Sequence, residues 1–294
     1  MQSRLSVAAK RLRIGLTYWW RHGRWPSLDR PRLFTELVQV RKLSDRDPRM
    51  PLLADKVAVK AFVAARLGAE WITPTLWQGS VLPRVAPWPA PFVVKARHGC
   101  RQNAFVRGES DDWDAVRRRA RGWSARHYGR WLDEWSYRNI PRGLLVEPMI
   151  GGAHVPPVDY KFFVFGGAVA YVQVHVGRGS RHRWIVLDPQ WRRVSAATRD
   201  PDPARPASLD RMIAAAETLA QGFDFVRCDF YEDDGKPLFG ELTFYPGSGL
   251  DPFDPPALDR QMGARWLAAQ APVSRPPTPT ATPIRSGSLE VAAA

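Results

Sequence analysis

The sequence predicts an α+β fold, because helix-like and strand-like segments are segregated along the chain. Residues 1–90 look helical and loop-rich, a run of strand-like segments occupies residues 144–187, and a helix, a strand hairpin and a last helix follow. The repeated strand–helix–strand order that would indicate a parallel sheet does not occur in this sequence. We therefore expect antiparallel sheets with helices packed against them.

The first half contains few strong secondary-structure signals. Apolar residues recur at helical spacing over residues 54–67, and Gly68 is a suitable C-terminal stop for that helix. Residues 14–20 form a helix or a strand, residues 91–95 a short buried strand, and residues 111–131 an Arg-rich helix with acidic residues in its first turn.

The second half is richer in strands. We predict strands at residues 144–150, 159–165, 168–176 and 182–187, with Gly166 and Gly167 as a two-residue hairpin turn between the second and third. A helix over residues 208–221, strands at 223–231 and 237–244, and a helix over 256–269 complete the pattern. Residues 271–294 are rich in Pro, Thr, Ser and Ala without apolar periodicity, so we expect a disordered tail.

Composition indicates a globular protein of the reducing cytoplasm. Of the 294 residues 45% are hydrophobic, yet no apolar run approaches the roughly 20 residues that span a bilayer. The apolar run near the start is ended by Arg21, and no small-residue cleavage site follows. Cys100 and Cys228 lie far apart and form neither a disulfide pattern nor a zinc-ligand motif.

The net charge of +14 would attract nucleic acid, anionic membrane surfaces or acidic small substrates, although an Arg-rich composition also results from a GC-rich genome. The segment 117–130 interleaves arginines with Trp123 and Tyr128, followed by Trp131, which would suit a single-stranded nucleic acid. No recognised nucleic-acid motif accompanies it, so no specific nucleic-acid partner is expected.

The strongest local signal lies in the last hairpin. Side chains alternate along strands, so Asp229 lies on the same face as Arg227, and Glu241 on the same face of the next strand as Thr243. A three-residue loop ending at Gly235 would bring the two carboxylates together on one face, whereas a two-residue turn would separate them. Paired carboxylates suit Mg²⁺, and the alternative is a pair of solvated edge-strand residues.

Other charged residues sit at strand ends. Lys95 ends an apolar strand, where a charge is costly unless a phosphate or carboxylate lies beside it, and a loop containing His98 follows. Asp159 and Lys161 share one strand face. Glu147 precedes Pro148, whose ring ends ladder pairing and leaves backbone groups open for a planar ligand such as adenine.

Taken in order, these segments resemble the TupA-like ATP-grasp family, which is associated with teichuronopeptide and other cell-surface polysaccharide synthesis. The resemblance covers roughly residues 30–265. It is carried by Asp55-Lys56 with Val59 and Lys60, Phe92-Val93-Val94-Lys95 with His98-Gly99, Glu134 with Tyr137, Glu147, Asp159-Tyr160-Lys161-Phe162-Phe163, Phe225-Val226-Arg227-Cys228-Asp229, and Gly240-Glu241-Leu242-Thr243 with Pro246-Gly247-Ser248-Gly249.

The resemblance implies an ATP-grasp fold with two subdomains clasping ATP. We expect an N-terminal region at 1–50, a first subdomain at 51–143 and a second at 144–270. Implied ligands of ATP are Lys95, Lys161, the loop of His98 and Gly99, and Glu147 with Met149; implied ligands of Mg²⁺ are Asp229, Glu241 and, more weakly, Thr243. Many ATP-grasp enzymes place Asn where this chain has Thr243, and Cys100 also departs from the family's usual small residue.

The implied activity is a carboxylate–amine ligase that works through an acyl phosphate. Arg227, Arg178 and Arg181 are the expected catalytic residues, because a guanidinium holds a carboxylate in a fork. The partners would be an anionic carboxylate and an amine acceptor, glycan-linked or associated with glycan synthesis. Two alternatives remain open: a kinase of a sugar or hydroxyl acceptor, and a basic nucleic-acid-binding module.

Overall fold

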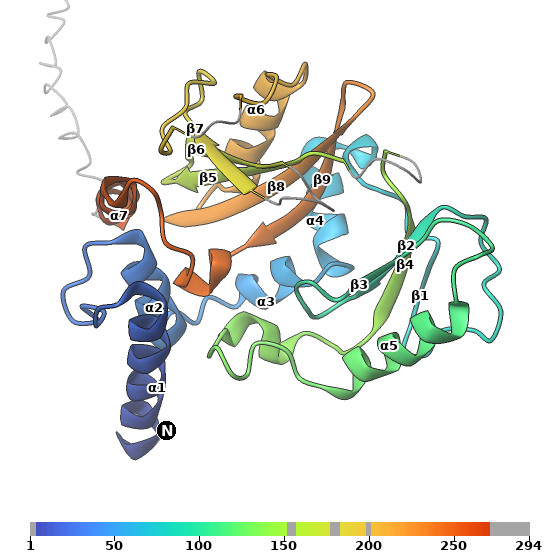
Figure 1. The fold of residues 1–294 in the computed structure, drawn as a ribbon, viewed down its shortest axis with the longest axis horizontal. Coiled ribbons are helices and arrows are strands. Elements are labelled where there is room, and N and C mark those ends of the chain that lie inside the picture. The colour runs from blue at the N-terminus through green and yellow to red at the C-terminus, as the bar shows by residue number, and fades with distance from the viewer. Residues whose placement is uncertain (1–3, 152–156, 177–182, 198–200, 271–294) are drawn as a thin grey trace, which may run out of the picture.

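Two antiparallel sheets face each other in the computed structural model, which describes residues 4–151, 157–176, 183–197 and 201–270. One sheet has four strands in the order β1-β4-β2-β3, and the other has five in the order β7-β6-β5-β8-β9. Helices pack on the outer faces of both sheets (Figure 1). The α+β prediction is therefore confirmed.

The helices and strands have the following bounds. The helices are α1 (Arg4–His22), α2 (Phe34–Ser44), α3 (Arg49–Ala54), α4 (Ala58–Leu67), α5 (Trp113–Ala125), α6 (Leu209–Leu219) and α7 (Pro256–Gln270), with short helical turns η1 (Ala69–Trp71), η2 (Trp135–Asn139) and η3 (Pro246–Gly249). The strands are β1 (Trp77–Gly79), β2 (Phe92–Ala96), β3 (Asn103–Val106), β4 (Leu144–Pro148), β5 (Asp159–Phe165), β6 (Ala168–Val176), β7 (Arg183–Leu187), β8 (Phe225–Asp233) and β9 (Lys236–Thr243).

The four-stranded sheet is assembled from distant segments. β4 lies between β1 and β2, pairing Val146 with both Trp77 and Val94. The predicted division after residue 143 separates this strand from its ladder partners β1 and β2, and the division remains a prediction. Pairing between segments about 50 residues apart leaves no local sequence signal. α5 covers one face through Val116 and Ala120.

The five-stranded sheet is polar at one end of its inner face and apolar at the other. Along β5, Asp159 and Lys161 share this face with Phe163 and Phe165, because side chains alternate. Both phenylalanines pack edge-on against Phe34 of α2, so α2 covers the apolar end. The polar end is left facing the other sheet.

α6 covers the opposite face of the five-stranded sheet. Its buried residues include Met212 and Ala216, and Cys228 of β8 donates its thiol to the carbonyl of Ala216. Cys228 is thus a core residue, as its buried position indicates. Because side chains alternate along β8, Cys228 faces α6 whereas Arg227 and Asp229 face the inner side of the sheet.

The N-terminal region is joined to the end of the described chain. α2 is almost wholly buried, and Asp259 of α7 accepts hydrogen bonds from the backbone and hydroxyl of Thr35 at 2.9 and 2.7 Å. Gly263 lies so close to the carbonyl of Arg32 that a Cβ there would come within 2.2 Å of it. α1 projects beside α2 at the edge of the molecule (Figure 1).

Several predicted elements have different limits in the structure. Residues 54–67 are divided between α3 and α4, and Asp55 in the connection accepts hydrogen bonds from the backbone of Val57 and Ala58 ahead of α4. The Arg-rich helix α5 stops at Ala125, before Gly129 adopts a φ of 71°. The tail at 271–294 lies outside the described residues, and the other domain limits remain predictions.

Candidate active site

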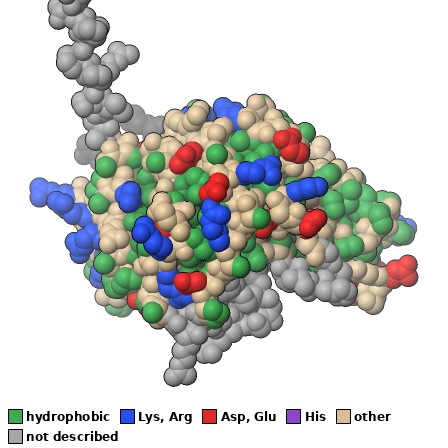
Figure 2. Space-filling view, turned by 90° about the horizontal axis from the view of Figure 1, so that it is seen from above, with side chains coloured by type: hydrophobic (Ala, Val, Ile, Leu, Met, Phe, Trp, Pro, Cys, Tyr) green, Lys and Arg blue, Asp and Glu red, His purple; other side chains and the backbone are tan. Residues whose placement is uncertain are grey.

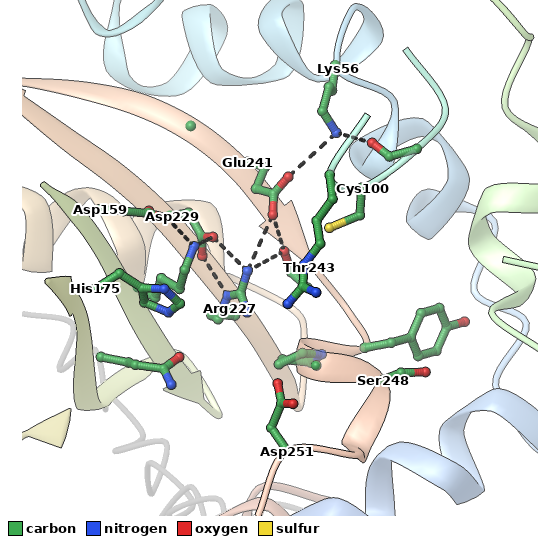
Figure 3. Close-up of a pocket in the computed structure, with 18 of the residues that line it drawn as sticks. Lys56, Cys100, Asp159, His175, Arg227, Asp229, Glu241, Thr243, Ser248 and Asp251 are labelled. Atoms are coloured by element: carbon green, nitrogen blue, oxygen red, sulfur yellow. Dashed lines mark hydrogen bonds and ion pairs between the residues drawn. The ribbon is translucent and has the colours of Figure 1, made fainter. Parts of the chain in front are cut away.

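A cavity of about 1320 Å³ lies between the two sheets. Its lining residues come from both sheets, from the α3–α4 connection, from the loop after β2, from η3 and from the end of α1. Figure 3 shows its centre, where charged side chains of β5, β8 and β9 point toward Lys56 and Cys100 on the other side. We treat this cavity as the candidate active site.

Asp229 and Glu241 are directly opposite each other in the β8–β9 ladder. The turn is not the predicted three-residue loop: Asp233 pairs with Lys236, so Asp234 and Gly235 alone form it, both with positive φ. A regular ladder from that turn would set Gly240 opposite Asp229 and send Glu241 to the other face.

A bulge restores the pairing. Phe230 pairs with Phe239 while Asp229 pairs with Glu241, so Gly240 is an extra residue in β9. A Cβ at Gly240 would lie 3.0 Å from the carbonyl oxygen of Asp229, and this close approach favours glycine. The two carboxylates share a face as predicted, by a different route.

Two cations hold Asp229. Arg227 binds it in a fork, with Nε 2.7 Å from Oδ1 and Nη2 2.6 Å from Oδ2, and Lys161 Nζ lies 2.5 Å from Oδ2 (Figure 3). Lys161 also contacts Asp159 at 2.6 Å. Arg227 reaches Glu241 at 3.3 Å and the hydroxyl of Thr243 at 3.1 Å. The predicted group is therefore one connected network.

The two opposed carboxylates differ electrostatically. Burial raises the pKa of Asp229, although Arg227 and Lys161 act in the opposite direction. Burial alone would also raise the pKa of Glu241, but Lys56, Lys161 and Arg227 lower it to about 2. Its side chain is 28% exposed toward the cavity, whereas that of Asp229 is 2% exposed. Glu241 is thus the accessible anion of the pair.

The residues present fit a magnesium ion. Among the residues that the structure describes, no group of three or more His, Cys, Asp or Glu side chains is arranged to hold a metal. Mg²⁺ commonly takes only one or two carboxylates and completes its shell with water and phosphate oxygens. The opposed pair of Asp229 and Glu241 offers those two carboxylates. Thr243 donates its hydroxyl to Glu241 Oε1 at 3.1 Å, which places it beside the pair.

The four-stranded sheet contributes a carboxylate between two lysines. Glu147 Oε2 accepts from Lys95 Nζ at 2.6 Å, and its Oε1 lies 2.5 Å from Lys60 Nζ. Burial would raise the pKa of Glu147, but the two lysines lower it. Glu147 therefore holds both ammonium groups at the cavity, and Lys95 has the carboxylate partner that its strand-end position requires.

His98 and Gly99 have different surroundings in the structure. The His98 ring is buried away from the cavity, where it contacts the carbonyls of Trp123 and Arg126 at 3.3 Å, and burial lowers its pKa. Gly99 and Cys100 line the cavity. His98 thus anchors the base of the loop beside α5 without lining the cavity, and the role of this loop at ATP remains a prediction.

Of the remaining predicted residues, Met149 does not line the cavity. Met149 donates its backbone N–H to the carbonyl of Pro91 at 3.2 Å, and the neighbouring Ile150 lines the cavity instead. Arg178 and Arg181 lie outside the described residues. Of the three arginines proposed as catalytic, the structure places Arg227 in the site.

Sequence reasoning assigned no role to two lysines that the structure places in the site. Lys56 lies 3.5 Å from Glu241 and donates to the carbonyl of Gly99 at 2.9 Å, while Lys60 pairs with Glu147. Lys56 precedes α4, and Lys60 lies in its first turn, four residues further along the chain. That spacing was the signal available.

The loop η3 forms another wall, supported from beneath by Lys42. Gly247, Ser248 and Gly249 have consecutive positive φ values of 52°, 58° and 64°. Lys42 Nζ donates to the carbonyl and hydroxyl oxygens of Ser248 at 2.6 and 2.7 Å, and burial lowers its pKa to about 8 while nearby Glu134 opposes the shift. The loop η3 therefore rests on a buried ammonium group.

A family model described as TupA-like ATPgrasp matches residues 36–267. The chain therefore belongs to the TupA-like ATP-grasp family, and the two facing antiparallel sheets are its ATP-grasp fold. No curated protein matches the sequence. No helix among the described residues is both long and apolar enough to cross a membrane.

Several ligases are among the solved structures similar in fold. The chain is 13% identical to D-alanine–D-alanine ligase from Bacillus anthracis complexed with ATP, with a TM-score of 0.43 over 74% of this chain and 63% of that one. The chain is 15% identical to the corresponding ligase from Helicobacter pylori, with a TM-score of 0.46 over 82% of this chain and 67% of that one. It is 16% identical to L-amino acid ligase from Bacillus licheniformis, with a TM-score of 0.40 over 68% of this chain and 42% of that one. The chain thus spans less than two thirds of some of these proteins.

Proposed function

We propose that this chain is an ATP- and Mg²⁺-dependent carboxylate–amine ligase that acts through an acyl phosphate. The observation that carries the proposal is the opposed pair Asp229 and Glu241, held by Arg227 and Lys161 in a cavity whose other wall carries Lys95 and Lys60. Metal-binding carboxylates and phosphate-binding cations would then face each other across one space.

The lysines are the groups suited to the nucleotide phosphates. Lys60 of α4 and Lys95 of β2 reach the cavity from one wall and Lys161 of β5 from the other, all with short carboxylate contacts that fix their ammonium groups. Phosphoryl transfer depends on positioning and on neutralising the charge of the transferring group. Ammonium groups fixed in advance supply that stabilisation without reorganising.

Asp229 and Glu241 would hold Mg²⁺, and Thr243 would orient Glu241 through its hydroxyl. The ion, when bound, neutralises charge on the phosphate oxygens. Arg227 keeps both carboxylates oriented through the bonds described above, and its own pKa is raised because Asp229 and Glu241 outweigh the effect of burial. Its guanidinium is thus a permanent cation beside the reacting groups.

The balanced reaction has two steps. A substrate carboxylate oxygen attacks the γ-phosphorus of ATP, the bond to the bridging oxygen breaks, and ADP leaves. An amine then attacks the acyl carbon, phosphate leaves with the electron pair, and the amine loses a proton to give an amide. Arg227 is the described residue suited to the carboxylate; Arg178 and Arg181 remain sequence-based proposals.

For the substrates, we propose an anionic carboxylate and an amine acceptor belonging to a cell-surface polysaccharide or its precursor. The net charge of +14 favours anionic substrates, and the association of the family with polysaccharide synthesis supports a glycan-linked acceptor. We place the reaction in the cytoplasm, where ATP is available.

Calorimetry with ATP and ADP, with and without Mg²⁺, tests the site. We expect the wild type to bind nucleotide in a metal-dependent way. Lys95→Ala should bind about tenfold more weakly, which corresponds to the loss of one phosphate contact of about 1.4 kcal/mol. Glu241→Gln should lose the metal dependence. The exposed Lys236→Ala on the β8–β9 hairpin is the matched control and should bind like the wild type.

A screen of carboxylates and amines for ADP release tests the reaction. A carboxylate-dependent release that also needs an amine supports the ligase. A stable phosphorylated hydroxyl product, formed without any amine, would instead identify a kinase. Absence of nucleotide binding under all conditions would refute the proposed site itself.

A further inference from the structure

The outward face of α1 is apolar and exposed to solvent. Leu12 and Leu16 are 58% and 48% exposed, and Trp19 and Trp20 are 49% and 73% exposed. Their spacing places all of them within one stripe of the helix, together with the exposed Ala8 and Ala9. Large apolar side chains gathered in such a stripe mark an interaction surface.

The other face of the same helix is already occupied. Ile14 and Tyr18 are buried, and the hydroxyl of Tyr18 lies 2.9 Å from that of Thr35. Gly15 sits under the ring of Trp25, where a Cβ would come within 2.4 Å of the ring. The helix is therefore fixed to the protein in one orientation, and the exposed stripe is not a face awaiting its own core.

Charge indicates what the stripe contacts. Residues 4–25 contain six Lys and Arg and no Asp or Glu. Four of these cations have acidic partners: Arg11 lies 2.7 Å from Asp29, Arg13 is bonded to Asp133, Arg21 lies 3.9 Å from Asp251, and Arg24 lies 3.0 Å from Glu36. The attraction to an anionic surface therefore comes mainly from the chain as a whole, whose net charge is +14. On the face shown in Figure 2, Lys and Arg side chains lie among Asp, Glu and hydrophobic ones.

We propose that the stripe Leu12–Leu16–Trp19–Trp20 of α1 docks on an anionic lipid surface. A helix with Leu and Trp on one side and Lys and Arg around it lies in the plane of a membrane interface, where indole rings are favoured. A second copy of this chain fits less well, because pairing two such helices would bring their like charges together.

Docking there would hold the mouth of the cavity at the lipid surface. Trp20 and Arg21 line the cavity, Arg21 Nε donates to the carbonyl of Leu250 at 3.1 Å, and the His22 ring contacts the carbonyl of Gly249 at 3.1 Å. α1 thus links the proposed docking stripe to the loop η3. An acceptor anchored in the membrane would meet the cavity there, a consequence that rests on the proposed function.

Flotation with vesicles of phosphatidylcholine, with and without phosphatidylglycerol, tests the stripe. We expect the wild type to bind the anionic vesicles, more weakly as salt rises. Leu12→Gln combined with Leu16→Gln should weaken this binding at least tenfold, since it removes apolar area without changing charge. Val81→Gln combined with Val85→Gln, at two exposed valines outside α1, is the matched control and should bind like the wild type.

Three results would overturn the proposal. The first is that the wild type does not bind anionic vesicles even at low salt. The second is equal binding by both double variants, which would assign the affinity to charge alone. The third is concentration-dependent dimerisation, lost in the α1 variant, without vesicle binding, which would assign the stripe to a second copy. Calorimetry of ATP binding by the same variants keeps this outcome separate from that of the nucleotide site.

Discussion

The two walls of the cavity both carry lysine–carboxylate ion pairs, but cations are in excess in the pairs of one wall and anions in those of the other. On the four-stranded sheet and α4, Glu147 lies between Lys60 and Lys95, so cations exceed anions by one. On the five-stranded sheet, Lys161 and Arg227 serve three carboxylates, Asp159, Asp229 and Glu241, so anions exceed cations by one. The first wall is thus suited to phosphate oxygens and the second to a metal ion.

The difference also extends to how tightly each wall is fixed. The side chains of Lys95 and Lys60 are 26% and 18% exposed at the cavity. The side chain of Asp229 is 2% exposed and is bonded to both Arg227 and Lys161. A buried ion pair that loses one partner leaves an uncompensated charge, which is costly. Changes to the second wall should therefore affect stability as well as activity.

Asp229→Asn should have the largest effect, because it removes the buried anion shared by Arg227 and Lys161. We expect ATP turnover to fall on the order of 100-fold or more and stability to fall by about 3–5 kcal/mol. ADP release and urea unfolding measure the two effects. Asp233→Asn, at the exposed end of the same strand, is the control. Turnover at the wild-type level would refute the metal assignment.

Gly240→Ala tests whether the bulge creates the anionic wall. The added Cβ would lie 3.0 Å from the backbone oxygen of Asp229, so β9 must shift or lose its extra residue. We expect a loss of about 1–3 kcal/mol in stability together with weaker Mg²⁺-dependent binding of ATP. Gly108→Ala, where a Cβ meets nothing within 4 Å, should leave both unchanged. An unaffected Gly240→Ala would show that the pairing does not need the bulge.

The smallest expected effect is on how the stability of the protein depends on pH. The pKa of Glu241 is lowered from 4.5 to about 2 in the folded chain, so the unfolded chain binds its proton first as pH falls. The stability contributed by the ionised form is present above pH 4.5 and is lost as pH falls toward 2. The urea midpoints of wild type and Glu241→Gln should therefore converge between pH 6 and pH 3.

The exposed Glu109→Gln serves as the reference for that comparison, and its urea midpoint should follow that of the wild type at every pH. If Glu241→Gln also followed the wild type throughout, the network around Arg227 would not stabilise the ionised carboxylate.

Local chemistry explains what the sequence predicted well. Strands β5 and β6 have the predicted limits, since Gly166 and Gly167 take the positive φ values of 56° and 85° that a tight hairpin turn requires. The common face of Asp229 and Glu241 was also predicted. The turn was wrong, because Asp234 tolerates positive φ and a one-residue bulge leaves no mark in the sequence except a glycine.

Features that depend on distant contacts were not predictable in the same way. The place of β4 between β1 and β2 is set by pairing across the chain, and the burial of His98 by carbonyls of α5. A histidine before a glycine gives the same local signal whether its ring faces a ligand or a helix end. The role of Lys42 beneath η3 was likewise invisible, since its partner lies 206 residues away.

The packing of α2 against α7 has a consequence for the synthesis of the protein. Thr35 and Asp259 are 224 residues apart, and α7 also supplies Trp266, which packs on Phe34. A ribosome adds residues from the N-terminus, so the part of α2 that packs on α7 stays uncovered until almost all of the described chain has been translated. The segment made first is therefore among the last to be covered, and it is a natural client for a chaperone during translation.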